Sequence, residues 1–218
     1  MKKLALVLAV VFTGQICLAQ MYITEWMYQG TQDSSYEFIE FTNMSTSAID
    51  MTGWSFDDDH QTPGAFDLSG FGIVQPGQSV ILTEVSASDF RDAWGLDSSI
   101  KVVGDLGVES GSNLGRADEI NLYDSFDNLV DRLTYGDSTE AGGPRTRYFS
   151  GNILLEYLGQ NDATQAVLSA NGDIYGSYIS NLGDAGNPGS YYAAIPEPAS
   201  LILFCLSGLA IRIRMRRN

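Results

Sequence analysis

The sequence is poor in the residues that support nucleophilic and zinc chemistry. Its two cysteines, Cys17 and Cys205, lie in the end segments, which excludes a disulfide, a zinc–thiolate site or a cysteine nucleophile from the part between them. The single histidine, His60, is not accompanied by a Gly-x-Ser-x-Gly elbow, and one histidine cannot form a zinc-binding pair. A glycine-rich phosphate loop is also missing. We therefore expect a protein that is not an enzyme.

Positive charge is scarce outside the two ends. Six of the 12 lysines and arginines lie in the ends and all 27 carboxylates lie between them, so six cations against 27 carboxylates give this part a formal charge of −21. Such a surface repels nucleic-acid phosphates and anionic lipids, and it favours divalent cations or basic partners. A plain solvated surface is the simpler alternative.

The N-terminus has the pattern of a secretory signal peptide over residues 1–19. Lys2 and Lys3 precede an apolar run over residues 4–12, and small residues allow cleavage between Ala19 and Gln20. The alternative is an uncleaved anchor helix, for which the apolar run is short. Removing the signal and the C-terminal segment leaves enough chain for one domain with a core of its own.

The C-terminal segment, residues 195–218, combines three elements in a fixed order. Pro196, Glu197 and Pro198 precede an apolar stretch that predicts a transmembrane helix over about residues 199–213. A basic tail over residues 212–217 follows, which by the positive-inside rule stays cytoplasmic. Its cations are Arg212, Arg214, Arg216 and Arg217. The apolar part, residues 199–211, spans only ~20 Å as a helix against a hydrocarbon core of ~30 Å, which suits a transient intermediate.

These three elements resemble a PEP-CTERM sorting signal. The resemblance implies recognition by an exosortase-type membrane enzyme of a Gram-negative bacterium that makes extracellular polysaccharide, with cleavage near Pro196–Pro198. It also implies an inner-membrane intermediate with a cytoplasmic C-terminus, followed by cleavage that releases or re-anchors the domain at the cell surface or in the extracellular space. An ordinary tail anchor with a proline-rich stem is the alternative.

The part between the ends reads as all-β. Short alternating segments separated by turn residues predict an antiparallel β-sandwich, and a helix is predicted only over residues 88–94, with Ser88 as its N-cap. The predicted strands cover residues 22–28, 37–41, 79–83, 119–123 and 129–135.

Six motifs in order over residues 21–135 are similar to those of the lamin-tail domain. They comprise residues 23–28, 36–43, 49–54, 75–82, 113–120 and 129–131. The resemblance implies an immunoglobulin-like β-sandwich over residues 21–136, and we interpret residues 137–192 as a Gly/Ser/Asn-rich extension and stalk. The last hairpin, residues 124–128, lacks the usual glycine, so Asn128 is expected to take the left-handed conformation.

Two kinds of residue in this region have a structural interpretation. Trp26 and Trp54 are expected in the core, with sugar stacking as the alternative. Alternation places Glu37 and Glu40 on opposite faces of one strand, each among apolar neighbours. One of these glutamates is expected to accept a buried backbone amide or to bind a basic group such as Arg116.

Calcium is the one cofactor that the sequence suggests. Asp57, Asp58 and Asp59 end a strand and enter a loop, with His60 and Asp67 nearby, and calcium prefers such oxygen ligands. The spacing matches no EF-hand, and a solvated turn is the alternative interpretation.

The sequence therefore predicts a non-enzymatic exported cell-surface or extracellular-matrix module with a binding or scaffold domain. Extracellular polysaccharide or another surface protein is the expected partner, and nucleic acid is not. A calcium-dependent carbohydrate-binding protein is the main alternative. A hydrolase of matrix glycans is a third hypothesis, which needs two carboxyl groups ~5–10 Å apart in a cleft.

Overall fold

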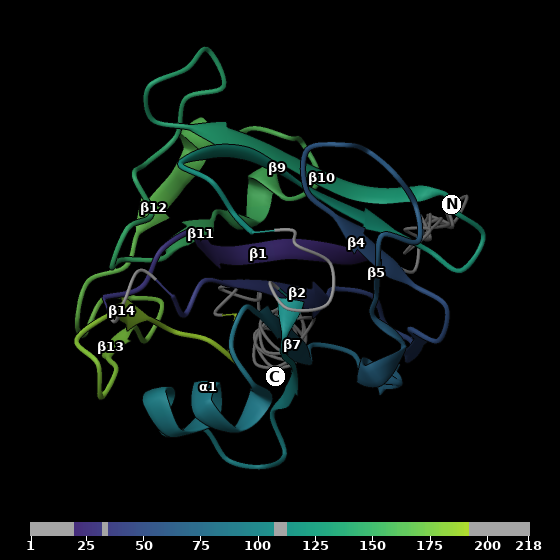
Figure 1. Cartoon of the computed structure of the whole chain (residues 1–218), viewed down its shortest axis with the longest axis horizontal. Coiled ribbons are helices and arrows are strands. Elements are labelled where there is room, and N and C mark those ends of the chain that lie inside the picture. The colour runs from purple at the N-terminus through teal and green to yellow at the C-terminus, as the bar shows by residue number, and fades with distance from the viewer. Residues whose placement is uncertain (1–19, 32–34, 107–112, 192–218) are drawn as a thin grey trace, which may run out of the picture.

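A computed structural model describes residues 20–31, 35–106 and 113–191 of the chain. Two sheets face each other in this part, which confirms the predicted all-β sandwich character (Figure 1). The larger sheet has the strand order β12 (Ala166–Leu168), β11 (Gly151–Ile153), β1 (Met21–Met27), β2 (Phe38–Asn43), β7 (Ser79–Thr83), β8 (Lys101–Val103). The smaller sheet has the order β10 (Leu129–Gly136), β9 (Ala117–Tyr123), β4 (Ser55–Asp57), β5 (Phe66–Asp67).

Neighbouring strands pair antiparallel, except for β7 and β8, which run parallel. Two short pairs complete the strands described, β3 (Ile49–Asp50) with β6 (Ile73–Val74) and β13 (Tyr178–Ile179) with β14 (Ala185–Gly186). The described residues also form three short 3-10 turns, η1 (Ser69–Phe71), η2 (Leu155–Tyr157) and η3 (Ala163–Gln165). The five strands predicted from alternation all form, as β1, β2, β7, β9 and β10.

The main core lies between the two sheets. Trp26 is fully buried and Trp54 is only 9 % exposed, so both belong to this core as predicted. The Trp26 ring lies 5.4 Å from the Tyr135 ring, and Gly151 of β11 lies against it. A Cβ at position 151 would come within 2.8 Å of the Trp26 ring, so a glycine is needed where β11 crosses it.

A second apolar cluster covers part of the outer face of the larger sheet. Met27, Phe38 and Ile81 point to this face, where Phe90 and Trp94 of α1 (Ala87–Trp94) pack on them. The N-cap lies two residues earlier than the predicted Ser88, because the Ser86 side chain accepts the amide of Asp89 and so satisfies a free N–H of the first turn. The prediction of Ser88 as N-cap was therefore wrong.

The hairpin between β9 and β10 closes by a different residue from the one predicted. Asp127, not Asn128, takes the left-handed conformation, with φ of 63°. The Asp124 carboxylate accepts the amides of Phe126 and Asn128, at 2.8 and 3.0 Å, and this fixes the turn so that the positive φ falls one residue earlier.

The chain after Tyr135 contributes to the larger sheet. β11 pairs with β1, with Asn152 opposite Glu25, and β12 then forms the edge of the sheet. From β14 the chain runs along the α1 side of the sheet to Tyr191 (Figure 1). β11, β12 and the segment from β14 to Tyr191 are thus parts of the folded domain.

The predicted signal peptide and C-terminal transmembrane helix lie outside the described residues. Among the helices that the structure does describe, none combines the length and apolar character needed to cross a bilayer.

Candidate functional site

The candidate calcium residues lie in a turn after β4, which we call the acidic turn, residues 57–60. Asp57 and Asp58 come together with His60, and one ligand atom from each lies within 4.8 Å of the others. Asp59 instead turns to His60, with its Oδ1 2.7 Å from the imidazole Nδ1. The structure thus brings two of the three predicted aspartates into one cluster and leaves the third beside it.

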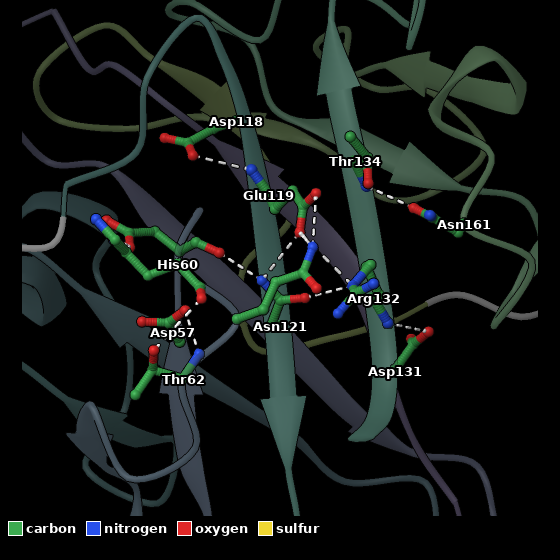
Figure 2. Close-up of polar contacts among 12 residues, drawn as sticks. Asp57, His60, Thr62, Asp118, Glu119, Asn121, Asp131, Arg132, Thr134 and Asn161 are labelled. Atoms are coloured by element: carbon green, nitrogen blue, oxygen red, sulfur yellow. Dashed lines mark hydrogen bonds and ion pairs between the residues drawn. The ribbon is translucent and has the colours of Figure 1, made fainter. Parts of the chain in front are cut away.

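The acidic turn is held in place by hydrogen bonds to Thr62 and to Asn121. The Asp57 carboxylate accepts the amide of Thr62 at 2.9 Å, and the Asn121 side-chain amide donates to the Asp58 carbonyl (Figure 2). Asn121 lies on β9 and also accepts from Arg132 of β10, so the turn is tied to the middle of the smaller sheet. Arg132 further pairs with Glu119 at 3.6 Å.

The electrostatics of the acidic turn favour a cation. Asp58 and Asp59 raise the pKa of His60 above its ordinary value, although the imidazole is 77 % exposed. Two carboxylates and an imidazole can hold a divalent ion, but the histidine makes the ligand set less typical of calcium than three aspartates would be. The geometry therefore fits a weak, solvent-accessible cation site at most.

A second group of carboxyl groups is buried within the fold. Glu37 is 3 % exposed and accepts the Leu114 amide at 2.9 Å, which is the role predicted for one of the two glutamates. Burial raises the pKa of Glu37 to about 9. The other option, an ion pair with Arg116, is not what forms, because Arg116 pairs with Asp137 at 2.6 Å.

Glu25 and Glu40, which we call the carboxylate pair, lie opposite each other on β1 and β2 with no solvent exposure. A β-bulge at Thr24 inserts one extra residue into β1, so that Thr24 and Glu25 both reach the outer face beside Glu40. Thr24 donates to Glu40 Oε1 at 2.7 Å, and Ser150 donates to Glu25 Oε1.

Burial raises the pKa of both members of the carboxylate pair, that of Glu40 to about 7 and that of Glu25 well above its ordinary value. The negative charge on Glu40 adds to the rise at Glu25. Sequence reasoning noticed Glu40 but missed Glu25, because a strict alternation would not place it beside Thr24 on one face. A bulge leaves no strong signal in a single sequence.

The predicted processing residues are Pro196, Glu197, Pro198 and the four terminal arginines, and the predicted cleavage pair is Ala19 and Gln20. All of these except Gln20 lie outside the described residues. Gln20 immediately precedes β1, and its side-chain amide donates to the carbonyl of Val130 at 3.4 Å.

The sandwich and the tail together define a β-domain protein with a C-terminal sorting motif. The lamin tail domain family matches residues 18–137, and the PEP-CTERM protein-sorting motif matches residues 194–217. Because the first match covers more than half of the 218 residues, the chain belongs to the lamin tail domain family. Among curated proteins, none matches this chain. The sorting motif indicates an exported protein that an exosortase recognises and processes at its C-terminus.

Proposed function

We propose that the protein is a non-enzymatic binding or scaffold module that is displayed at the cell surface or in the extracellular matrix after processing. The observation that carries the proposal is that a PEP-CTERM motif and a folded lamin tail domain occur in one chain, with the motif at its C-terminal end. The buried carboxyl groups support it, because Glu25, Glu37 and Glu40 are all used inside the fold to accept hydrogen bonds. Extracellular polysaccharide or another surface protein is the proposed partner.

The proposed route to the surface passes through the inner membrane. The signal peptide, cut between Ala19 and Gln20, exports the domain, and the helix over residues 199–213 holds it until cleavage near Pro196–Pro198. The arginines from Arg212 to Arg217 keep the C-terminus cytoplasmic.

Replacing Pro196, Glu197 and Pro198 together by alanine is expected to stop C-terminal processing. The prolines hold an extended backbone that a protease cleft can read, and alanine allows the helix to extend through this region. The protein should then remain in the inner-membrane fraction at its unprocessed mass, as measured by intact-mass spectrometry. Ser200→Ala, in the same segment but outside the motif, is the control. Normal processing of the triple variant would contradict the proposed sorting role.

The second candidate function, calcium-dependent carbohydrate binding, is favoured by the clustering of Asp57, Asp58 and His60. If it is right, calorimetric titration of the processed protein with calcium should give heat, and matrix polysaccharide should then bind only in the presence of calcium. An Asp57→Asn, Asp58→Asn variant should bind calcium at least ~10-fold more weakly, since two charged ligands are lost. Asp162→Asn on an exposed turn is the control. Absence of heat with either ligand would remove this candidate.

No observation favours a glycan hydrolase. Such an enzyme needs two accessible carboxyl groups on either side of the substrate bond. The carboxylate pair is fully buried and is covered by the chain between Ala185 and Tyr191.

A further inference from the structure

The last described residues, 185–191, form a segment that we call the strap. It crosses the outer face of the larger sheet, and three of its backbone amides donate to side chains of three successive strands. Asn187 donates to Glu25 Oε1 at 2.9 Å, Gly189 to Glu40 Oε2 at 2.7 Å, and Tyr191 to Ser79 Oγ at 3.2 Å. These acceptors lie on β1, β2 and β7, so the strap is bound only when these strands are already assembled.

The start of the strap is fixed differently from its end. Ala185 exchanges backbone hydrogen bonds with the chain before β11, accepting from Ser150 and donating to Tyr148, both at 2.9 Å. Gly186 then passes so close to Trp94 and Glu25 that a Cβ would come within 3.0 Å of both. Beyond this point, side chains of the sheet provide the acceptors for the strap amides of Asn187, Gly189 and Tyr191. Two of those three acceptors are titratable.

The polar surface beneath the strap holds two carboxyl groups that have no positive charge beside them in the part of the chain that the structure describes. Glu25 Oε2 is buried and has no hydrogen-bond partner among the described residues, and Glu40 lies directly across from Glu25. Asp173 raises the pKa of Glu25 further, and the charges of Glu25 and Glu40 act on Tyr178 and Tyr191; none of these three neighbours can supply a positive charge. Ionising both carboxyl groups would therefore bury two like charges, which is strongly unfavourable.

The position of the strap decides how far the sorting motif can reach. With the strap bound, Pro196 comes five positions after Tyr191, a span of at most ~17 Å. With the strap released as far back as Ala185, Pro196 comes eleven positions after the last bound residue, a span of up to ~38 Å. A bound strap keeps the motif close to the sheet, and a released strap gives it about twice the reach.

We propose that the strap is a releasable latch, fastened by the carboxylate pair, that sets the distance between the folded domain and the sorting motif. Its link to processing rests on the proposed function, whereas the latch itself does not. The latch holds while the carboxylate pair is protonated and opens when both groups ionise. A chain whose larger sheet has not assembled cannot bind the strap. The sorting motif is therefore held close to the sheet only when the domain is folded.

Hydrogen exchange of the full-length protein in detergent micelles tests the latch. Opening exposes Glu40, whose pKa then returns from about 7 toward its ordinary value of 4.5. Between pH 5 and pH 9, after correction for intrinsic exchange, protection of the amides of Asn187, Gly189 and Tyr191 should therefore fall by about 10- to 100-fold. Amides of β9 and β10, outside the latch, report that the sandwich stays folded.

The Glu25→Gln, Glu40→Gln variant is the decisive comparison. Glutamine keeps a carbonyl acceptor for each strap amide and cannot ionise, so the strap should stay protected at both pH values. Glu156→Gln, which neutralises an exposed carboxylate near Tyr191, should behave like the wild type. An unchanged pH dependence in the double variant, or a strap unprotected even at pH 5, would overturn the latch.

Processing in the host separates the latch from the sorting role. If the reach of the motif matters, the double glutamine variant should be cleaved at a different rate from the wild type and the Glu156→Gln control. Equal rates alongside the expected exchange pattern would overturn the link between the latch and processing. A wild-type chain that is never cleaved would refute the proposed function and leave the exchange result standing.

Discussion

The Glu37→Gln protein is expected to lose clearly less stability between pH 5 and pH 9 than the wild-type protein does. Glu37 is buried beside the Leu114 amide, and burial raises its pKa from 4.5 to about 9. Glutamine retains the carbonyl that accepts this amide but has no proton to lose. The variant should therefore fold alike and differ mainly in its dependence on pH.

The direction of the effect follows from proton linkage. A carboxyl group whose pKa is raised by folding stays protonated in the folded state at pH values where the unfolded chain has already released the proton. The free energy of unfolding then falls as the pH rises from about 4.5 toward about 9. The free energy of unfolding falls by about 1.4 kcal/mol for each pH unit in this range, so Glu37 accounts for a loss of several kcal/mol. That is a large part of a typical domain stability of ~5–15 kcal/mol.

Two other buried carboxyl groups lower the free energy of unfolding over lower ranges of pH. Burial raises the pKa of Glu40 to about 7 and that of Asp131 to about 6, so their contributions are complete before pH 9. The slope that remains between pH 7 and pH 9 therefore belongs largely to Glu37 and to Glu25, whose pKa burial also raises well above its ordinary value.

Urea unfolding of the processed protein at pH 5, 7 and 9, followed by tryptophan fluorescence, measures the effect. Glu140→Gln, which neutralises an exposed carboxylate, is the matched control and should keep the wild-type slope. If Glu37→Gln lost stability with pH as steeply as the wild type, the buried acid at position 37 would not be the source.

The strands were predictable because their signal is local. Alternation along residues 37–41 places Ile39 and Phe41 on one face and Glu40 on the other, and the structure confirms this division, with the first face turned to the main core. The helix was also visible, although its cap was not. Ser86 and Ser88 are both acceptable caps, and only the geometry of the chain leaving β7 decides between them.

The features that the sequence did not reveal depend on distant contacts. Glu25 and Glu40 become a pair through a bulge on β1 and through strap residues such as Asn187, which is 162 positions away from Glu25. The acidic turn was visible because its residues are consecutive, but its attachment to the smaller sheet depends on Asn121 of β9, which donates to the Asp58 carbonyl. Contacts between residues so far apart in the chain leave no periodic pattern in the sequence from which they could be predicted.

The folding unit extends beyond the part of the chain that matches the lamin tail domain family, so we expect truncation at the end of that match to abolish stable folding. The lamin tail domain match ends at residue 137, yet the sandwich is completed by the chain up to Tyr191. β11 and β12 extend the larger sheet beyond β1, and the strap covers the carboxylate pair. A chain of residues 20–137 is therefore expected to lack a cooperative unfolding transition, whereas a chain of residues 20–191 should show one.

The expectation rests on what the shorter chain would lose from the core. Ile153 and Ala163 are buried in the main cluster, and Leu158 packs against it. Each large apolar side chain removed forfeits ~1.5–3 kcal/mol, and the edge of β1 beside Trp26 loses its strand partner as well. Together these losses are comparable with the lower end of a typical domain stability of ~5–15 kcal/mol.

Circular dichroism and urea unfolding of the two chains, each purified without the signal and sorting segments, measure the difference. A third chain, residues 20–184, lacks only the strap and should fold with lower stability, since it keeps β11 and β12 but leaves Glu25 and Glu40 uncovered. A cooperative transition in the 20–137 chain equal to that of the 20–191 chain would show that the family boundary is also the folding boundary. The graded order, with 20–191 most stable and 20–137 least, follows only if the C-terminal chain is part of the core and the strap adds to it.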